Sequence, residues 1–298
     1  MRVVVTGAAG NVGLHVTQEL LRQGIRVRAV DRQACPEVLN GHPCLQWRQG
    51  GADDERLLEQ VMDGSDAVAH LAAVPHPQDE DPLNMVATNV LSTFATLHAA
   101  AEAGITRVAV SSSMSIYGMA WTPHRFSPEY VPLDEGHPQR PHDPYAVTKQ
   151  TDESMAAMMH RRHGMDLVCL RMPFTNSGET LRQRIQLDQA EPGGVGAKEL
   201  WGWLDARDAA RAFHRALTVP VHGYHALNVA APTTTVETDT NELLAQFHPD
   251  TQIRTALTGP QGLIDTRRAE HVLGFVPEHD WRDMWPDLAE AASATAPR

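Results

Sequence analysis

The sequence is poor in cysteine and lacks long apolar runs. Its three cysteines are odd in number and have no metal-ligand spacing, which argues against a disulfide framework and a zinc site. No apolar run reaches the roughly 18 to 20 residues that a membrane span needs. The segment that begins at Met1 carries no signal-peptide pattern. These absences predict a reduced, cytoplasmic protein with no membrane partner.

Lysine is also scarce. Of the 25 basic residues, 23 are arginines, and the lysines are Lys149 and Lys198. With 37 acidic residues the net charge is -12, and no basic cluster would follow a phosphate backbone, so we expect no nucleic-acid partner. The 16 histidines form no recognised ligand set, so we expect no metal site. The composition, 42% hydrophobic and 21% charged, is that of a globular protein.

Short apolar segments alternate with amphipathic ones in the first half of the chain, which is typical of βαβ units. We expect strands at 3–6, 26–31, 45–48, 67–72, 107–111 and 166–170, and helices at 11–22, 54–62, 82–103 and 145–163. Six strands with crossovers predict an α/β fold with a Rossmann-type doubly wound parallel sheet. We assign residues 1–172 to this dinucleotide-binding domain and 173–298 mainly to a smaller substrate-binding domain, with some later segments returning to the first.

A glycine-rich turn joins the first strand to the first helix, in the order Thr6-Gly7-Ala8-Ala9-Gly10-Asn11-Val12-Gly13. Its glycines lack the Cβ atoms that would keep a pyrophosphate from the backbone amides and the helix N-terminus. Asp31, at the end of the next strand, can accept hydrogen bonds from a ribose diol, which favours NAD. Arg32 beside it can pair with a 2′-phosphate, so NADP remains an alternative.

Tyr145 and Lys149 lie four residues apart on one face of a predicted helix. Tyrosine, with a pKa of about 10, is a poor base at neutral pH. A nearby ammonium stabilises the phenolate and lowers that pKa. The pair therefore predicts a general acid/base, and the alternative is a surface tyrosine packed against a lysine stem.

A run of serines from Ser111 to Ser115 follows the fifth strand, at an end of the sheet where such folds bind ligands. A hydroxyl there can polarise a carbonyl. The glycine turn, His70-Leu71-Ala72-Ala73, the serine run up to Tyr117-Gly118 and the tyrosine-lysine pair occur in an order that resembles the extended short-chain dehydrogenases/reductases of the NAD-dependent epimerase/dehydratase family. The resemblance covers residues 1–172 and, through 203–210, most of the chain.

The resemblance implies roles for single residues. Ser113 would be the catalytic hydroxyl, Tyr145 the acid/base, and Lys149 its tuner and a ribose ligand. Together with the motifs, the resemblance implies a set of residues that contact the cofactor. These are Gly7, Ala9, Gly10, Asn11, Val12, Gly13, Asp31, Arg32, Ala52, Asp53, Leu71, Ala72, Ala73, Asn89, Ser111, Tyr145, Lys149, Met172 and Pro173. At the substrate we expect Val74, His76, Ser113, Met114 and Phe174. For Asn89, an amide on the helix surface is an equally weighted alternative. The resemblance also implies a homodimer that forms through the predicted helices 82–103 and 145–163.

The chain departs from the family pattern at Met114 and Ser115, where the family's sugar dehydratases have an Asp-Glu pair, and at two further positions. Family members often have an aspartate after the third strand that binds adenine; Gly51 stands there, and Asp53 is the candidate substitute. The family's nucleotide-sugar epimerases have an asparagine three residues after the arginine that corresponds to Arg171. Phe174 occupies that position here, and its ring cannot hydrogen-bond a sugar nucleotide in that way.

Three functions remain open. We favour an NAD(P)-dependent dehydrogenase or reductase that moves hydride between nicotinamide and a secondary alcohol or ketone of a small-molecule substrate. The alternative is an epimerase of a sugar or nucleotide sugar that retains its NAD. A non-catalytic nucleotide-binding sensor is the third reading, but a sensor would not need Ser113, Tyr145 and Lys149 together.

Overall fold

The computed structural model describes residues 1–75, 77, 81–124 and 126–289. His76, predicted at the substrate, lies outside the described residues. The strands are β1 (Arg2–Thr6), β2 (Arg26–Asp31), β3 (Leu45–Gln49), β4 (Ala67–His70), β5 (Arg107–Ser113), β6 (Tyr130–Val131), β7 (Asp166–Met172), β8 (Phe174–Asn176), β9 (Trp203–Asp205), β10 (Tyr224–Asn228) and β11 (Gln252–Ile253). The helices are α1 (Asn11–Arg22), α2 (Glu55–Met62), α3 (Pro82–Glu102), α4 (Pro144–His163), α5 (Gly178–Ala190), α6 (Val195–Lys198), α7 (Ala206–Thr218), α8 (Thr240–Phe247), α9 (Arg267–Leu273) and α10 (Trp281–Met284), with 3-10 turns η1 (Glu37–Leu39) and η2 (Met114–Tyr117).

A seven-stranded sheet forms the centre of the molecule, in the order β10-β7-β5-β4-β1-β2-β3. All of its neighbouring strands are parallel. The chain moves outward from β1 to β3 and then returns to β4 on the other side, so the strand order reverses between β1 and β4. This is the predicted Rossmann-type doubly wound fold, and ligands bind such sheets at the carboxyl ends beside the reversal.

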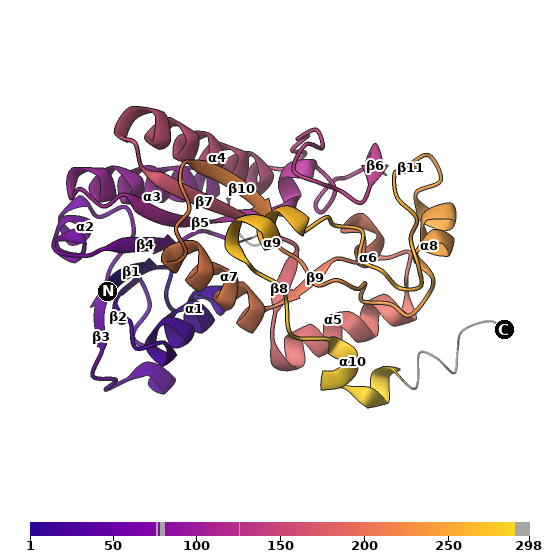
Figure 1. Ribbon diagram of the computed structural model, residues 1–298, viewed down its shortest axis with the longest axis horizontal. Helices are drawn as coiled ribbons and strands as arrows, with labels where there is room; N and C mark the ends of the chain where they lie inside the picture. The colour runs from indigo at the N-terminus through magenta and orange to yellow at the C-terminus, as the bar shows by residue number, and fades with distance from the viewer. Residues whose placement is uncertain (76, 78–80, 125, 290–298) are drawn as a thin grey trace.

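Helices cover both faces of this sheet (Figure 1). On one face α1 and α7 pack together and, with α9, bury the odd-numbered side chains of β1, Val3 and Val5. On the other face α2, α3 and α4 pack against Val4 and Val68. Because alternate side chains of a strand point to opposite faces, strands covered on both sides must be apolar throughout, as β1 is.

The segments after residue 172 contribute to two regions. β10 joins the central sheet beside β7, and α7 covers one of its faces. The segments α5, α6, α8, β8, β9 and β11, together with the earlier β6, form a smaller region around the buried Trp201 and Trp203. The boundary between 172 and 173 remains a prediction. Within the described residues, no helix is long and apolar enough to span a bilayer.

Local hydrogen bonds explain several element boundaries. Asp54 and Asp143 cap α2 and α4 by accepting hydrogen bonds from the backbone N–H groups of Leu57 and Ala146. α1 differs, because its N-cap is Gly10 and no side chain caps it. The first backbone N–H groups of α1 are therefore available to an anion at the carboxyl end of β1.

Candidate active site

Two cavities lie at the carboxyl ends of the central strands. The larger, of about 520 Å³, is bordered by the glycine turn, the end of β5, the first turns of α4 and the segment 172–176. The smaller, of about 320 Å³, is bordered by the end of β2 and by Ala52. Gly7 and Gly10 line both cavities, so the two cavities meet at the glycine turn.

The glycine turn requires its small residues. A Cβ atom on Gly7, whose φ is +71°, would lie 2.6 Å from the backbone nitrogen of Ala72. A Cβ on Gly13 would lie 2.0 Å from the Gly7 carbonyl oxygen. At Gly10 a Cβ would meet only that same oxygen, at 3.3 Å, and would otherwise point into open space. The bare Gly10 and the uncapped α1 N-terminus fit the pyrophosphate of a dinucleotide.

Asp31 ties the glycine turn to the end of β2. Its two carboxylate oxygens accept hydrogen bonds from the backbone N–H groups of Ala9, at 2.8 Å, and Gln33, at 2.9 Å. Asp31 also lines the smaller cavity. Each carboxylate oxygen has a second lone pair, so the group can still accept hydrogen bonds from a ribose.

Arg32 and Asp53 form an exposed ion pair at the rim of the smaller cavity. Arg32 Nη2 lies 3.2 Å from Asp53 Oδ2. A Cβ on Gly51 would lie only 2.0 Å from Asp53 Oδ1, so the Asp53 side chain folds over the glycine. The Asp53 carboxylate thus occupies the space next to Gly51 where a side chain of residue 51 would begin.

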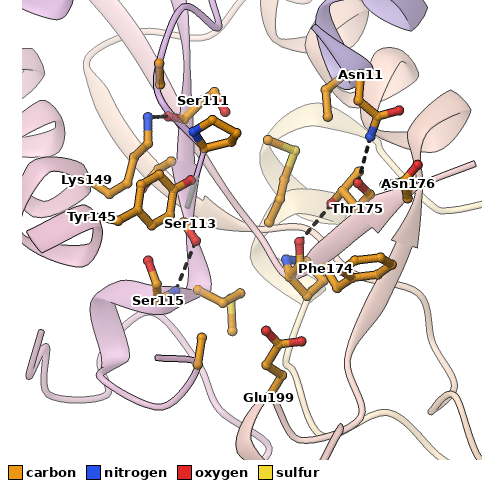
Figure 2. Close-up of a pocket in the computed structure, with 18 of the residues that line it drawn as sticks. Asn11, Ser111, Ser113, Ser115, Tyr145, Lys149, Phe174, Thr175, Asn176 and Glu199 are labelled. Carbon is orange, nitrogen blue, oxygen red and sulfur yellow. Dashed lines mark hydrogen bonds between the residues drawn. The ribbon is translucent and has the colours of Figure 1, made fainter. Parts of the chain in front are cut away.

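Ser113, Tyr145 and Lys149 line the larger cavity together (Figure 2). Ser113 ends β5, and its Oγ accepts a hydrogen bond from the Ser115 backbone N–H at 3.1 Å. Tyr145 and Lys149 lie one turn apart in α4, with Nζ 5.7 Å from the centre of the tyrosine ring. The predicted set is therefore assembled in space, beside the glycine turn.

Lys149 is buried and has a carboxylate partner. Its Nζ donates to the Ser111 carbonyl at 3.0 Å and to Asp152 Oδ2 at 3.1 Å. Burial acts to lower the pKa of Lys149, but Asp152 and Tyr145 outweigh it and the pKa is raised. The ammonium therefore stays charged, and one of its three N–H groups remains for the cavity.

The pKa of Tyr145 is raised rather than lowered, which corrects the expectation from the sequence. Burial is the largest effect and raises the pKa, while the Lys149 charge and a hydrogen bond with Ser113 lower it. Asp152 weakens the influence of the lysine, because its opposite charge lies beside the ammonium. Tyr145 is thus a protonated phenol at neutral pH in this structure.

Two buried polar groups hold the turn after β4. The His70 ring nitrogens lie 2.8 Å from Thr6 Oγ1 and 3.0 Å from Thr93 Oγ1. Asn89 is fully buried; its Oδ1 accepts from the Val74 N–H at 2.7 Å, and its amide donates to the Val74 carbonyl at 3.2 Å. A helix-surface amide at Asn89 is therefore wrong, because the side chain fixes the loop that borders both cavities.

The structure places most of the predicted site residues at the two cavities. Those that line the larger cavity are Gly7, Gly10, Asn11, Val12, Gly13, Leu71, Ala73, Ser111, Ser113, Met114, Tyr145, Lys149, Met172, Pro173 and Phe174. Those that line the smaller one are Gly7, Gly10, Asp31, Arg32, Ala52, Leu71, Ala72, Ala73 and Val74. Ala9, Asp53 and Asn89 lie behind these surfaces and contact them through the hydrogen bonds given above.

Several residues at the site were not predicted. Asn176, Arg184 and Glu199 line the larger cavity, and Asp152 pairs with Lys149 behind it. The first three follow residue 172, where the alternation of strands and helices in the sequence becomes less regular. The spacing of Asp152, three residues after the lysine on one helix, is a signal that could have identified it.

Comparison with known proteins assigns the family. Residues 3–230 match the model of the NAD dependent epimerase/dehydratase family. The chain is 28% identical over 221 residues to the L-arabinose 1-dehydrogenase (NAD(P)(+)) of Haloferax volcanii, covering 72% of this chain and 82% of that protein. It is 31% identical over 189 residues to the dTDP-glucose 4,6-dehydratase of Streptomyces niveus, covering 57% of this chain but only about half, 53%, of that enzyme.

The solved structures agree with this assignment. A short-chain dehydrogenase/reductase superfamily protein from Agrobacterium tumefaciens, solved with bound NAD, superimposes with a TM-score of 0.71 at 28% identity and covers 99% of this chain and 97% of that one. The relatives include a dehydrogenase, dehydratases and epimerases, so they share the family and not one reaction. The chain belongs to the NAD-dependent epimerase/dehydratase family of extended short-chain dehydrogenases/reductases.

Proposed function

We propose that the protein is an NAD-dependent oxidoreductase that moves hydride between nicotinamide and a secondary alcohol or ketone carbon of a small molecule. The observation that carries the proposal is the common cavity of Ser113, Tyr145 and Lys149 beside the glycine turn. A hydroxyl, a phenol and a buried ammonium in one cavity are suited to proton transfer at a substrate oxygen. NAD supplies the hydride acceptor when bound, and NADH the donor.

Residues of both cavities would hold the cofactor. The smaller cavity offers Asp31 to the adenosine ribose and Ala52 to the adenine, with Asp53 at the rim. The bare Gly10 and the uncapped N-terminus of α1 suit the pyrophosphate. Met172 and Pro173, at the end of β7, border the larger cavity, where the nicotinamide would lie.

The chain's own residues move the proton. Because burial raises the pKa of Tyr145, its Oη carries a proton and can give it to a substrate carbonyl oxygen during reduction. The Lys149 charge and the Ser113 hydrogen bond favour the phenolate that this transfer leaves. In the oxidising direction the same phenolate takes the proton from the substrate hydroxyl.

An epimerase that retains its NAD is the second candidate, and the amide of Asn176 in the larger cavity favours it. Phe174 stands where the family's nucleotide-sugar epimerases have an amide, and its ring lies under Arg184, with 4.7 Å from the guanidinium carbon to the ring centre. An amide is nevertheless present two residues later, because Asn176 lines the same cavity. We favour net oxidation or reduction, since Phe174 makes the expected position apolar.

Two experiments test the proposal. Tyr145→Phe removes the proton donor and keeps the ring, so we expect turnover to fall about 100-fold or more with every accepted substrate. Intact turnover in this variant would refute the mechanism. Mass spectrometry of nucleotide released by denaturing fresh protein separates the two candidates: near-stoichiometric NAD supports the epimerase, whereas an empty site that binds added NADH supports the oxidoreductase.

We further propose a homodimer through α3 and α4, which pack side by side. Their outer surface exposes apolar side chains, including Leu91 at 58%, Phe94 at 44% and Val147 at 44%. Exposed apolar groups gathered on neighbouring helices mark an interaction surface. A second copy of the chain, packed by the same two helices, would cover them by two-fold symmetry.

A further inference from the structure

Three charged side chains meet where α5 and the segment after α6 border the larger cavity. Arg184 Nε lies 3.0 and 2.9 Å from the two carboxylate oxygens of Asp188. Arg184 Nη2 donates to Glu199 Oε2 at 2.7 Å. One cation thus faces two carboxylates, so the cluster has a net charge of -1 when both are ionised.

The two carboxylates have different surroundings. Asp188 is 1% exposed, and its Oδ2 also accepts a hydrogen bond from Thr235 Oγ1 at 2.8 Å, which joins α5 to the segment after β10. The Glu199 side chain is 13% exposed and lines the cavity. Within the described residues its Oε1 has no hydrogen-bond donor. Figure 2 shows this carboxylate pointing into the cavity, on the side away from Lys149.

The cavity around this carboxylate has an apolar wall, and its described lining residues include no cation without a carboxylate partner. Other lining side chains are those of Met119, Trp121, Val195 and Leu200. Apolar surroundings strengthen a hydrogen bond to a carboxylate. Among the described residues that line the cavity, the cations are Lys149 and Arg184, and each is already paired with a carboxylate. An anionic group placed beside Glu199 would therefore meet repulsion without a compensating cation from these residues.

We propose that Glu199 determines substrate specificity by accepting, through Oε1, a hydrogen bond from a hydroxyl of a neutral polyhydroxylated substrate such as a free sugar. The same carboxylate disfavours substrates that carry a carboxylate or phosphate at that end. The inference rests on the proposed function, because it names the substrate class of that same cavity. Arg184 has a positioning role, since it holds Glu199 through Oε2 and leaves Oε1 to the substrate.

The test compares two sugars that differ at one carbon. D-galactose and D-galacturonate are titrated by calorimetry into the protein with and without NADH, a state in which neither sugar can be oxidised. We expect the wild-type protein to bind D-galactose about tenfold more tightly than D-galacturonate, the size of one charge-assisted hydrogen bond. Glu199→Gln should abolish this preference. Glu191→Gln makes the same chemical change at an exposed position outside the cavity and should keep it.

Each other result overturns the inference. Equal binding of the two sugars by the wild-type protein, no binding of D-galactose, or an unchanged ratio in Glu199→Gln would do so. The proposed function fails in a different way, because it predicts turnover that depends on Tyr145. A binding preference that requires Glu199, together with turnover unaffected by Tyr145→Phe, would keep the specificity residue and refute the mechanism.

Discussion

Replacing His70 with asparagine should make the loss of stability between pH 7 and pH 5 about 2 kcal/mol smaller. Burial lowers the pKa of His70 to about 3, and the Lys149 charge acts in the same direction. The folded protein therefore keeps the ring neutral, while the unfolded chain binds a proton below about pH 6.5. The contribution of His70 is complete above that pH and is lost progressively as the pH falls from 6.5 towards 3.

The size of the effect follows from the two pKa values. Each pKa unit corresponds to about 1.4 kcal/mol. With 6.5 in the unfolded chain and about 3 in the folded protein, protonation of the unfolded state lowers the free energy of unfolding by about 2 kcal/mol between pH 7 and pH 5. At pH 3 the loss reaches about 4 kcal/mol.

Urea denaturation at both pH values measures the free energy of unfolding. His70→Asn is less stable at pH 7, because Thr6 and Thr93 lose a partner, but its loss on acidification should be about 2 kcal/mol smaller than in the wild-type protein. His163→Gln, at an exposed position, should behave like the wild type. Equal losses in all three proteins would refute the reasoning. If His70→Asn does not fold, the NMR signal of the wild-type His70 ring should not titrate between pH 7 and pH 5.

Three further outcomes are expected. Asp53→Ala releases Arg32 from its ion pair, so kcat/KM with NADP relative to NAD should rise about tenfold in coenzyme kinetics, and an unchanged ratio would contradict the role of the pair. Asp152→Asn leaves the buried charge of Lys149 without a carboxylate and should lower the free energy of unfolding by about 3 kcal/mol in urea, with part of that loss restored when Lys149→Met is added. Leu91→Arg places a charge on the exposed face of α3 and should convert the proposed homodimer to a monomer in sedimentation equilibrium; a wild-type monomer would count against the dimer.

Local signals predicted the first half of the chain well. The observed bounds of α1 and β2 coincide with the predicted ranges, and α2 differs by one residue because Asp54 caps it. Here the apolar period, the capping residue and the glycine turn all act within a few residues of one another. The turn and the helix that bears Tyr145 were found for the same reason.

The parts that escaped prediction depend on distant contacts. Asp152 is fully buried, although an acidic residue three positions from a lysine on a helix is usually a solvated pair. Glu199 is held by Arg184 of α5, which lies 15 residues earlier in the chain. Asp53 was named from the sequence as the substitute at Gly51, but the folding of its side chain over that glycine was not predicted. Of these, only Asp152 has a spacing that could have identified it, three residues after Lys149 on one helix; the other placements follow from the fold.

The return of β10 and α7 to the central sheet has a consequence for synthesis on the ribosome. The sheet face formed by Val3 and Val5 is covered in part by Phe213 of α7, and Leu227 of β10 extends the same apolar cluster. After β7 has left the ribosome, translation at roughly 5 to 20 residues per second needs roughly 3 to 11 s to reach the end of β10. During that interval α1 covers only part of this apolar face, so the dinucleotide-binding sheet is completed well after its first six strands have been made.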